Sequence, residues 1–183
     1  DFQWLRTPWP EEIFSLTDYR NRHALYKTDP LLQKAHARFP WVTTWDDHEV
    51  DNDYAGAFQE NRDPEAAFLD RRAAAYRAYY EHMPLRRSSL PSGPDMQLYR
   101  ACRFGTLAEF FVLDTRQYRA VQACGEGRRG GGQVVDDCAA RLDPAQARLG
   151  AQQERWLFEG LARSTARWNV LAQQQVMAQT RRR

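Results

Sequence analysis

The acidic segment at residues 46–53 constrains the fold of this 183-residue chain more than any other feature. It places five carboxylates and one imidazole in eight positions, directly after the aromatic and β-branched residues 41–45, which predict a short buried strand. Concentrating so much negative charge at the end of a buried strand costs free energy unless a positive group compensates it. A divalent or trivalent cation is the natural compensator, because carboxylate oxygen, amide oxygen and imidazole nitrogen are ligands of hard and borderline metals.

Two other interpretations of the acidic segment are considered. A solvated acidic turn is the usual explanation for a run of charges, and composition alone leaves it open. A calcium loop of the EF-hand type would account for the alternation of Asp47, Glu49 and Asp51. That pattern fails because Asn52 stands at the glycine position and Phe58 stands at the closing glutamate position.

The rest of the chain predicts intermixed helices and strands. Caps and apolar spacing predict helices that begin near Thr17 or Asp18 as N-cap, at Pro30 after the cap Asp29, after Asp63-Pro64, and at Gly150. In the third helix, arginines 71, 72 and 77 are expected to face away from the apolar side. Residues 98–104 and 107–113 predict an antiparallel hairpin with a central second strand, and 168–172 predict a further strand. Together they predict one α/β piece over residues 1–183.

Composition excludes several classes of protein. The 26 basic and 24 acidic residues nearly cancel, so bulk charge does not indicate a nucleic-acid-binding protein. With 43% hydrophobic and 13% aromatic residues, the chain is not of the disordered class. No apolar run approaches the ~18 residues that a transmembrane helix requires.

The three cysteines are too few for a disulfide scaffold, and they lack the CxxC spacing of a zinc site. Cys124 and Cys138 flank a glycine-rich loop with almost no hydrophobic content. A disulfide across this loop is expected if the protein is exported, and two unrelated thiols are the alternative. Cys102 lies in a predicted strand with no ligand context.

Several stretches resemble PhoD-like phosphatases. The string WDDHEVDNDYAG at 45–56 is similar to the family's signature, in which a strand delivers a W-D-D-H-E-x-x-N segment to the metal site. Residues 15–50, FFVLDTRQYR at 110–119, and residues 149–179 resemble other stretches of that family in the same order. The resemblance covers essentially the whole chain. It implies part of a two-sheet α/β/β/α metallophosphatase-like fold, with this chain as a central section truncated at both ends.

The resemblance also implies an activity and a set of site residues. The family consists of metal-dependent phosphoester hydrolases, alkaline phosphatases and phosphodiesterases, that use a metal-bound hydroxide. Asp47 stands at the position of a metal ligand, and Asp46 lies in or beside the same coordination shell. His48 stands where related enzymes contact phosphate or protonate the leaving oxygen, and Asn52 is a candidate phosphate or metal contact.

The other polar residues near this motif are expected to have supporting roles. Glu49 and Asp51 either orient their neighbours or remain solvated. Asp114 and Arg116 are expected to be structural, paired with each other or with the backbone. The three histidines outside the acidic segment, His23, His36 and His82, have no acidic cluster around them and are expected to be ordinary.

The family context implies iron and calcium as cofactors, a phosphomonoester or phosphodiester substrate, and a periplasmic or secreted location. Neither specific nucleic-acid binding nor a transmembrane segment is expected, and the oligomeric state is not predicted. The upstream and downstream ligand motifs of the family have no counterpart in this chain, so the chain alone is expected to be inactive. A non-catalytic calcium-binding module is the alternative.

Overall fold

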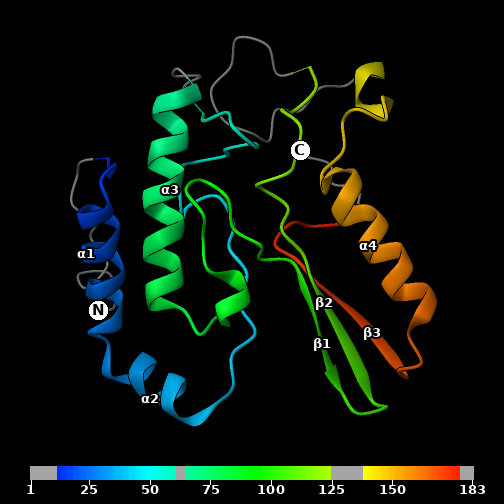
Figure 1. Ribbon diagram of the computed structural model, residues 1–183, viewed down its shortest axis with the longest axis horizontal. Helices are drawn as coiled ribbons and strands as arrows, with labels where there is room; N and C mark the ends of the chain where they lie inside the picture. The colour runs from blue at the N-terminus through cyan, green and yellow to red at the C-terminus, as the bar shows by residue number, and fades with distance from the viewer. Residues whose placement is uncertain (1–11, 61–64, 125–137, 178–183) are drawn as a thin grey trace, which may run out of the picture. The chain divides into compact units, whose positions relative to one another are not determined.

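Figure 1 shows the computed structural model, which describes residues 12–60, 65–124 and 138–177. The chain forms two compact units. The first unit combines the segment up to Thr43 with Leu69–Met96, and the second combines Thr44–Phe68 with the segment from Gln97 onward. Helices and strands are both present, which confirms the predicted α/β class. The single piece over residues 1–183 stays a prediction.

Local capping signals set the helix ends of the first unit. α2 spans Pro30–Arg38, and the Asp29 carboxylate accepts hydrogen bonds from the first N–H groups of this helix, as predicted. α1 spans Leu16–Lys27, and here the predicted cap is wrong. Ser15 is the N-cap, because its hydroxyl accepts from the Asp18 N–H while the Asp18 carboxylate accepts from the Ser15 N–H.

α3 (Glu65–His82) buries two of the arginines that were expected to face outward. Arg71 donates through Nε to the Tyr19 hydroxyl at 2.9 Å, and its Nη2 lies 2.6 Å from the Glu12 carboxylate. Arg72 donates to the Pro94 carbonyl. The prediction failed because these partners come from elsewhere in the chain and let a guanidinium be buried with its hydrogen bonds satisfied. The predicted start of this helix at Asp63-Pro64 lies outside the described residues.

The second unit contains a three-stranded sheet in the order β1-β2-β3. β1 (Arg100–Phe104) pairs antiparallel with β2 (Ala108–Val112), which confirms the hairpin. β3 (Trp168–Ala172) pairs parallel with β2, so β2 is central, as its apolar sequence predicted. Among the described residues this is the only sheet with more than two strands, and the two-sheet arrangement stays a prediction.

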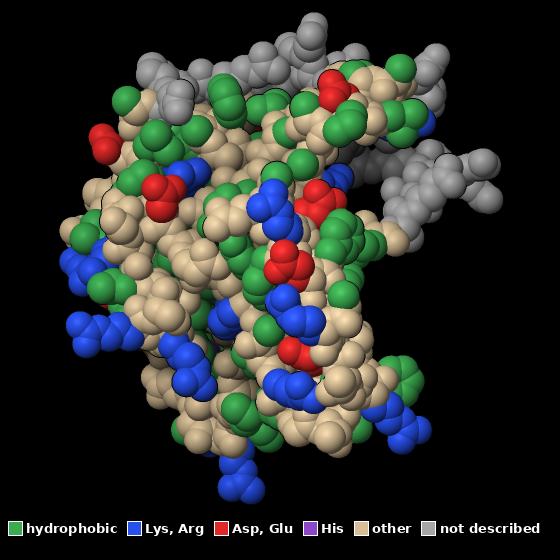
Figure 2. All heavy atoms as spheres, turned by 45° about the vertical axis from the view of Figure 1, so that its right-hand side comes forward, with side chains coloured by type: hydrophobic (Ala, Val, Ile, Leu, Met, Phe, Trp, Pro, Cys, Tyr) green, Lys and Arg blue, Asp and Glu red, His purple; other side chains and the backbone are tan. Residues whose placement is uncertain are grey.

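α4 (Gly150–Arg163) lies beside this sheet (Figure 1), and its apolar residues pack against it. Phe111 and Leu113 from the central strand and its end form a buried cluster with Leu157 of the helix. The outward side of α4 carries charged residues of both signs, including the Arg163–Glu159 ion pair. Figure 2, which brings this side of the molecule forward, shows acidic and basic side chains interspersed, in keeping with the nearly balanced charge.

Residues 41–45 do not form the predicted strand. Trp41 and Val42 are 37% and 43% exposed, whereas Trp45 is fully buried. The segment is held by single long-range hydrogen bonds instead of a strand ladder: Thr44 Oγ1 donates to the Leu113 carbonyl at 2.8 Å. An apolar β-branched sequence shows that a segment is extended and partly buried, but it does not supply a neighbouring strand.

The cysteine prediction is confirmed, because Cys124 and Cys138 form a disulfide with their Cα atoms 6.1 Å apart. The loop between them, residues 125–137, lies outside the described residues. Cys102 is a free thiol. No described helix is long and apolar enough to cross a membrane.

The closest approach of α4 to the sheet generates a stability prediction. A Cβ added at Gly160 would lie 2.5 Å from a ring carbon of Phe111, which is only 1% exposed and belongs to the buried cluster between α4 and the sheet. We expect Gly160→Ala to lower the free energy of unfolding by about 1–3 kcal/mol, although alanine favours the helix by about 0.5–1 kcal/mol. Urea unfolding of the purified protein measures the change.

Phe111→Leu provides the control background, because it removes the ring that the new methyl group would meet. In this background Gly160→Ala should cost clearly less, and the difference between the two costs isolates the contact. Equal costs in the two backgrounds would show that the ring is not responsible.

Candidate functional site

The acidic segment lies at the carboxyl end of the central strand β2. The Gln174 amide, just after β3, donates to the carbonyl of Trp45 and to Thr44 Oγ1. The indole of Trp45 donates to Asp114, just after β2, at 3.0 Å. The carboxyl ends of parallel strands are where α/β proteins place their sites. The acidic segment therefore lies at the end of a strand, but this strand is β2 and not the predicted strand at residues 41–45, which does not form.

Arg116 binds three carboxylates of the acidic segment at once. Its Nε donates to Asp46 at 2.7 Å and its Nη1 donates to Asp53 at 2.9 Å. Its Nη2 lies 3.5 Å from Asp47 Oδ1. Burial opposes the charge, but the bond to Asp46 and the attraction of Asp47 outweigh it and raise the pKa of Arg116. The expected pairing of Arg116 with Asp114 or the backbone was therefore incomplete, because its main partners lie about 70 residues earlier in the chain.

Asp47, the predicted metal ligand, is held in its ionised form. Its side chain is 13% exposed, and its Oδ2 accepts the Asp53 N–H at 2.7 Å. Burial acts against its negative charge, but this hydrogen bond and the attraction of Arg116 prevail, so the pKa of Asp47 is lowered. Asp47 is thus held as a carboxylate, the form in which it can bind a cation.

His48 and Asn52 lie together beside Asp47. The His48 Nε2 is 3.2 Å from the Asn52 amide oxygen and 3.9 Å from Asp47 Oδ2. The His48 side chain is 78% exposed, so its ring is accessible to a substrate. The structure thus brings the predicted residues Asp47, His48 and Asn52 into one small group, with Asp46 turned toward Arg116.

Glu49 and Asp51 orient their neighbours, which was one of the two expected roles. Glu49 Oε2 accepts the Asp46 N–H at 2.7 Å, and burial raises the pKa of Glu49. Asp51 is buried and accepts the Glu60 N–H at 3.2 Å. Asp51 is buried and Glu49 is partly buried, and both carboxylates accept backbone N–H groups, so the interpretation of this segment as a solvated acidic turn is wrong for Asp51.

Asp114 is a fully buried carboxylate that organises the turn after β2. It accepts the backbone N–H groups of Arg116 and Gln117 at 3.0 and 2.9 Å, as well as the indole of Trp45. Gln153 of α4 accepts the Asp114 N–H and donates to its carbonyl. Burial raises the pKa of Asp114 despite these donors. Its structural role was predicted correctly.

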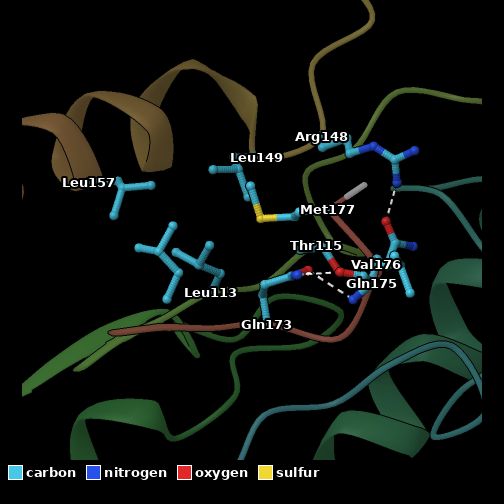
Figure 3. A pocket seen from close by; sticks show the side chains of 10 residues that line it. Leu113, Thr115, Arg148, Leu149, Leu157, Gln173, Gln175, Val176 and Met177 are labelled. Carbon is cyan, nitrogen blue, oxygen red and sulfur yellow. Dashed lines mark hydrogen bonds between the residues drawn. The ribbon is translucent and has the colours of Figure 1, made fainter. Parts of the chain in front are cut away.

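A separate cavity of about 530 Å³ lies between α4 and the segment that follows β3 (Figure 3). Its lining includes Leu113, Thr115, Leu149, Leu157, Gln173 and Met177. The Arg148 guanidinium donates to Gln175 at one side of it. No carboxylate or histidine of the described chain lines this cavity, so it does not share the chemistry of the acidic segment.

The donor atoms of the acidic segment fit calcium and iron in type: carboxylate oxygens from Asp46 and Asp47, the Asn52 amide oxygen and the His48 imidazole. In the described ranges, however, no group of three or more His, Cys, Asp or Glu side chains is arranged to hold a metal ion. The segment therefore supplies part of a donor set. Iron and calcium stay predictions.

The sequence analysis did not predict that two arginines, Arg116 and Arg119, pair with this segment. Arg119 is also buried, with its Nη1 3.5 Å from Asp53, and burial together with the charge of Arg116 lowers its pKa. The sequence did contain an indication of these contacts, because the acidic segment requires a positive group near it. Arginine is as capable as a metal of meeting that requirement.

Comparisons with known proteins agree with the resemblance. The model of the PhoD-like phosphatase family matches residues 2–183. Alkaline phosphatase D of Bacillus subtilis (strain 168) is 56% identical over 170 residues, which cover 93% of this chain and 28% of that protein. A solved structure described as "Structure of PhoD" matches with a TM-score of 0.82 and 56% identity, covering 91% of this chain and 31% of that one. This chain thus spans less than a third of the length of these relatives, and it belongs to the PhoD-like phosphatase family.

Proposed function

We propose that the complete gene product containing these residues is a metal-dependent phosphoester hydrolase acting on phosphomonoesters or phosphodiesters outside the cytoplasm. The observation that carries this proposal is the group formed by Asp47, His48 and Asn52 at the carboxyl end of β2, in a chain of the PhoD-like phosphatase family. A cation bound there, calcium or iron, would supply an activated water and neutralise charge on the phosphoryl oxygens.

The chain's own residues have distinct tasks in this proposal. Asp47, kept ionised by the Asp53 N–H and Arg116, supplies a carboxylate ligand. His48 is exposed and close enough to the ligand position to contact a phosphoryl oxygen or to give a proton to the leaving oxygen. Asn52 orients the imidazole through its amide oxygen. The family match favours this enzyme over the alternative of a non-catalytic calcium-binding module.

Asp47→Asn tests the ligand assignment. In the complete protein we expect the variant to lose metal and, with it, turnover of p-nitrophenyl phosphate, because an amide provides neither the charge nor the donor strength of a carboxylate. Metal analysis of the purified variant and a phosphatase assay measure both effects. Asp70→Asn, which makes the same change at an exposed position of α3, is the control. Full metal content with normal turnover in Asp47→Asn would rule out the assigned role.

His48→Ala should behave differently, because its side chain acts on the substrate and not on the metal. We expect turnover to fall by roughly 10²-fold or more, the scale of a single general acid, with metal content largely retained. His36→Ala is the control, since that ring stacks on Trp41 and lies outside the acidic segment. Wild-type turnover in His48→Ala would contradict the proposal.

The 183-residue chain by itself should show no phosphatase turnover above background with added iron and calcium. Its described residues offer no complete set of metal ligands, so no water is held in line with a phosphoester. Assays with p-nitrophenyl phosphate and its bis-ester at alkaline pH measure this. Metal-dependent hydrolysis that disappears with Asp47→Asn would show that this chain carries a complete site.

A further inference from the structure

We propose that Arg116 is a positioning residue that keeps the acidic segment folded, with Asp47 in place, before any cation binds. The inference rests on the proposed function only in taking Asp47 as the ligand to be positioned. The effect of the Arg116 contacts on the segment can be measured without an activity assay.

The guanidinium is the common partner of the two ends of the segment. It joins Asp46 at the beginning to Asp53 at the end through separate nitrogens, at 2.7 and 2.9 Å. A planar guanidinium with several donors in a fixed geometry can hold two carboxylates in a set orientation, whereas an ammonium group cannot. The third contact, from Nη2 to Asp47 Oδ1 at 3.5 Å, places positive charge next to the ligand position.

Arg116 is itself held firmly. Its side chain is 6% exposed, its N–H donates to the buried Asp114 carboxylate, and its carbonyl accepts the Gly56 N–H at 2.9 Å. The backbone of Arg116 is therefore fixed just after the end of β2, and its side chain extends from this fixed position. Fixing one long side chain in advance lowers the entropy lost when the segment folds around it.

The fold of the segment brings together carboxylates that repel one another. The Asp47 carbonyl accepts the N–H groups of Val50 and Asp51 at 2.8 and 2.9 Å, and the Asp47 carboxylate accepts the Asp53 N–H. Asp53 also adopts a positive φ of 48°, a conformation that costs free energy in residues other than glycine. Without Arg116, this turn would bring three carboxylates together, and the ion pairs left to them among the described residues would be the longer contacts of Arg119 with Asp53, at 3.5 Å, and of His48 with Asp47, at 3.9 Å.

Hydrogen exchange of the complete protein, after removal of metals with a chelator, tests the proposal. In the wild type, the amides of Val50, Asp51 and Asp53 should be protected. In Arg116→Gln they should exchange at least roughly tenfold faster, because a buried ion-pair network contributes far more than a surface pair. Added calcium should restore most of the protection, since a cation then replaces the missing charge.

Two further variants separate charge from geometry and from general damage. Arg116→Lys keeps the positive charge but loses the planar guanidinium that bonds two carboxylates at once. The amides of the segment should therefore show protection between those of the wild type and Arg116→Gln. Arg119→Gln removes an equally buried arginine whose single contact with Asp53 is 3.5 Å long, and it should exchange like the wild type in this segment. Amides of β2 serve as an internal reference for global opening.

The proposal is overturned if the wild-type segment is unprotected without metal, if Arg116→Gln equals the wild type, or if Arg119→Gln loosens the segment as much as Arg116→Gln does. It is also overturned if β2 and the segment lose protection equally, because Arg116 would then be a general structural residue. Metal content and phosphatase turnover of the wild type are measured separately. Failure of the proposed function therefore shows there, and failure of this inference shows in the exchange rates.

Discussion

The contact between Arg116 and the acidic segment is the interaction on which the site depends. It joins residues about 70 positions apart, with Asp46 and Asp53 bonded to one guanidinium that is almost fully buried. Removing one partner of a buried ion pair typically costs about 3–5 kcal/mol, whereas a whole domain is stable by only about 5–15 kcal/mol. Contacts of this size make the position of the acidic segment sensitive to the turn after β2, which carries this arginine.

The turn after β2 itself depends on the packing of α4. Gln153 of α4 binds both the N–H and the carbonyl of Asp114, and the Asp114 carboxylate caps the N–H of Arg116 and anchors the Trp45 indole. These groups are buried, so each would be costly if it lost its partner. Hydrophobic packing of α4 on β2 thus sets the position of a hydrogen-bonded network, and the network sets the position of the acidic segment.

The elements that sequence reasoning predicted are those with local causes. The hairpin of β1 and β2, the Asp29 cap and the helix from Gly150 each follow from turn residues, capping side chains or apolar spacing within a few positions. The elements that it missed have distant causes. In the part of the chain that the structure describes, residues 41–45 have no strand partner, and the partners of Arg71 and Arg116 are brought close only by the fold. Single-sequence patterns carry no direct record of such pairings.

The difference between local and distant causes also affects whether the acidic segment indicates a metal site. The number of carboxylates alone indicates only that positive charge must be nearby, and Arg116 and Arg119 already supply two guanidinium groups to Asp46, Asp47 and Asp53. Charge counting therefore does not require a cation. The stronger argument is the position of Asp47: the Asp53 N–H and Arg116 keep it ionised, and it lies beside the exposed ring of His48. An ionised carboxylate beside an accessible imidazole is a pair of groups that functional sites present to a ligand, and a count of charges alone does not reveal it.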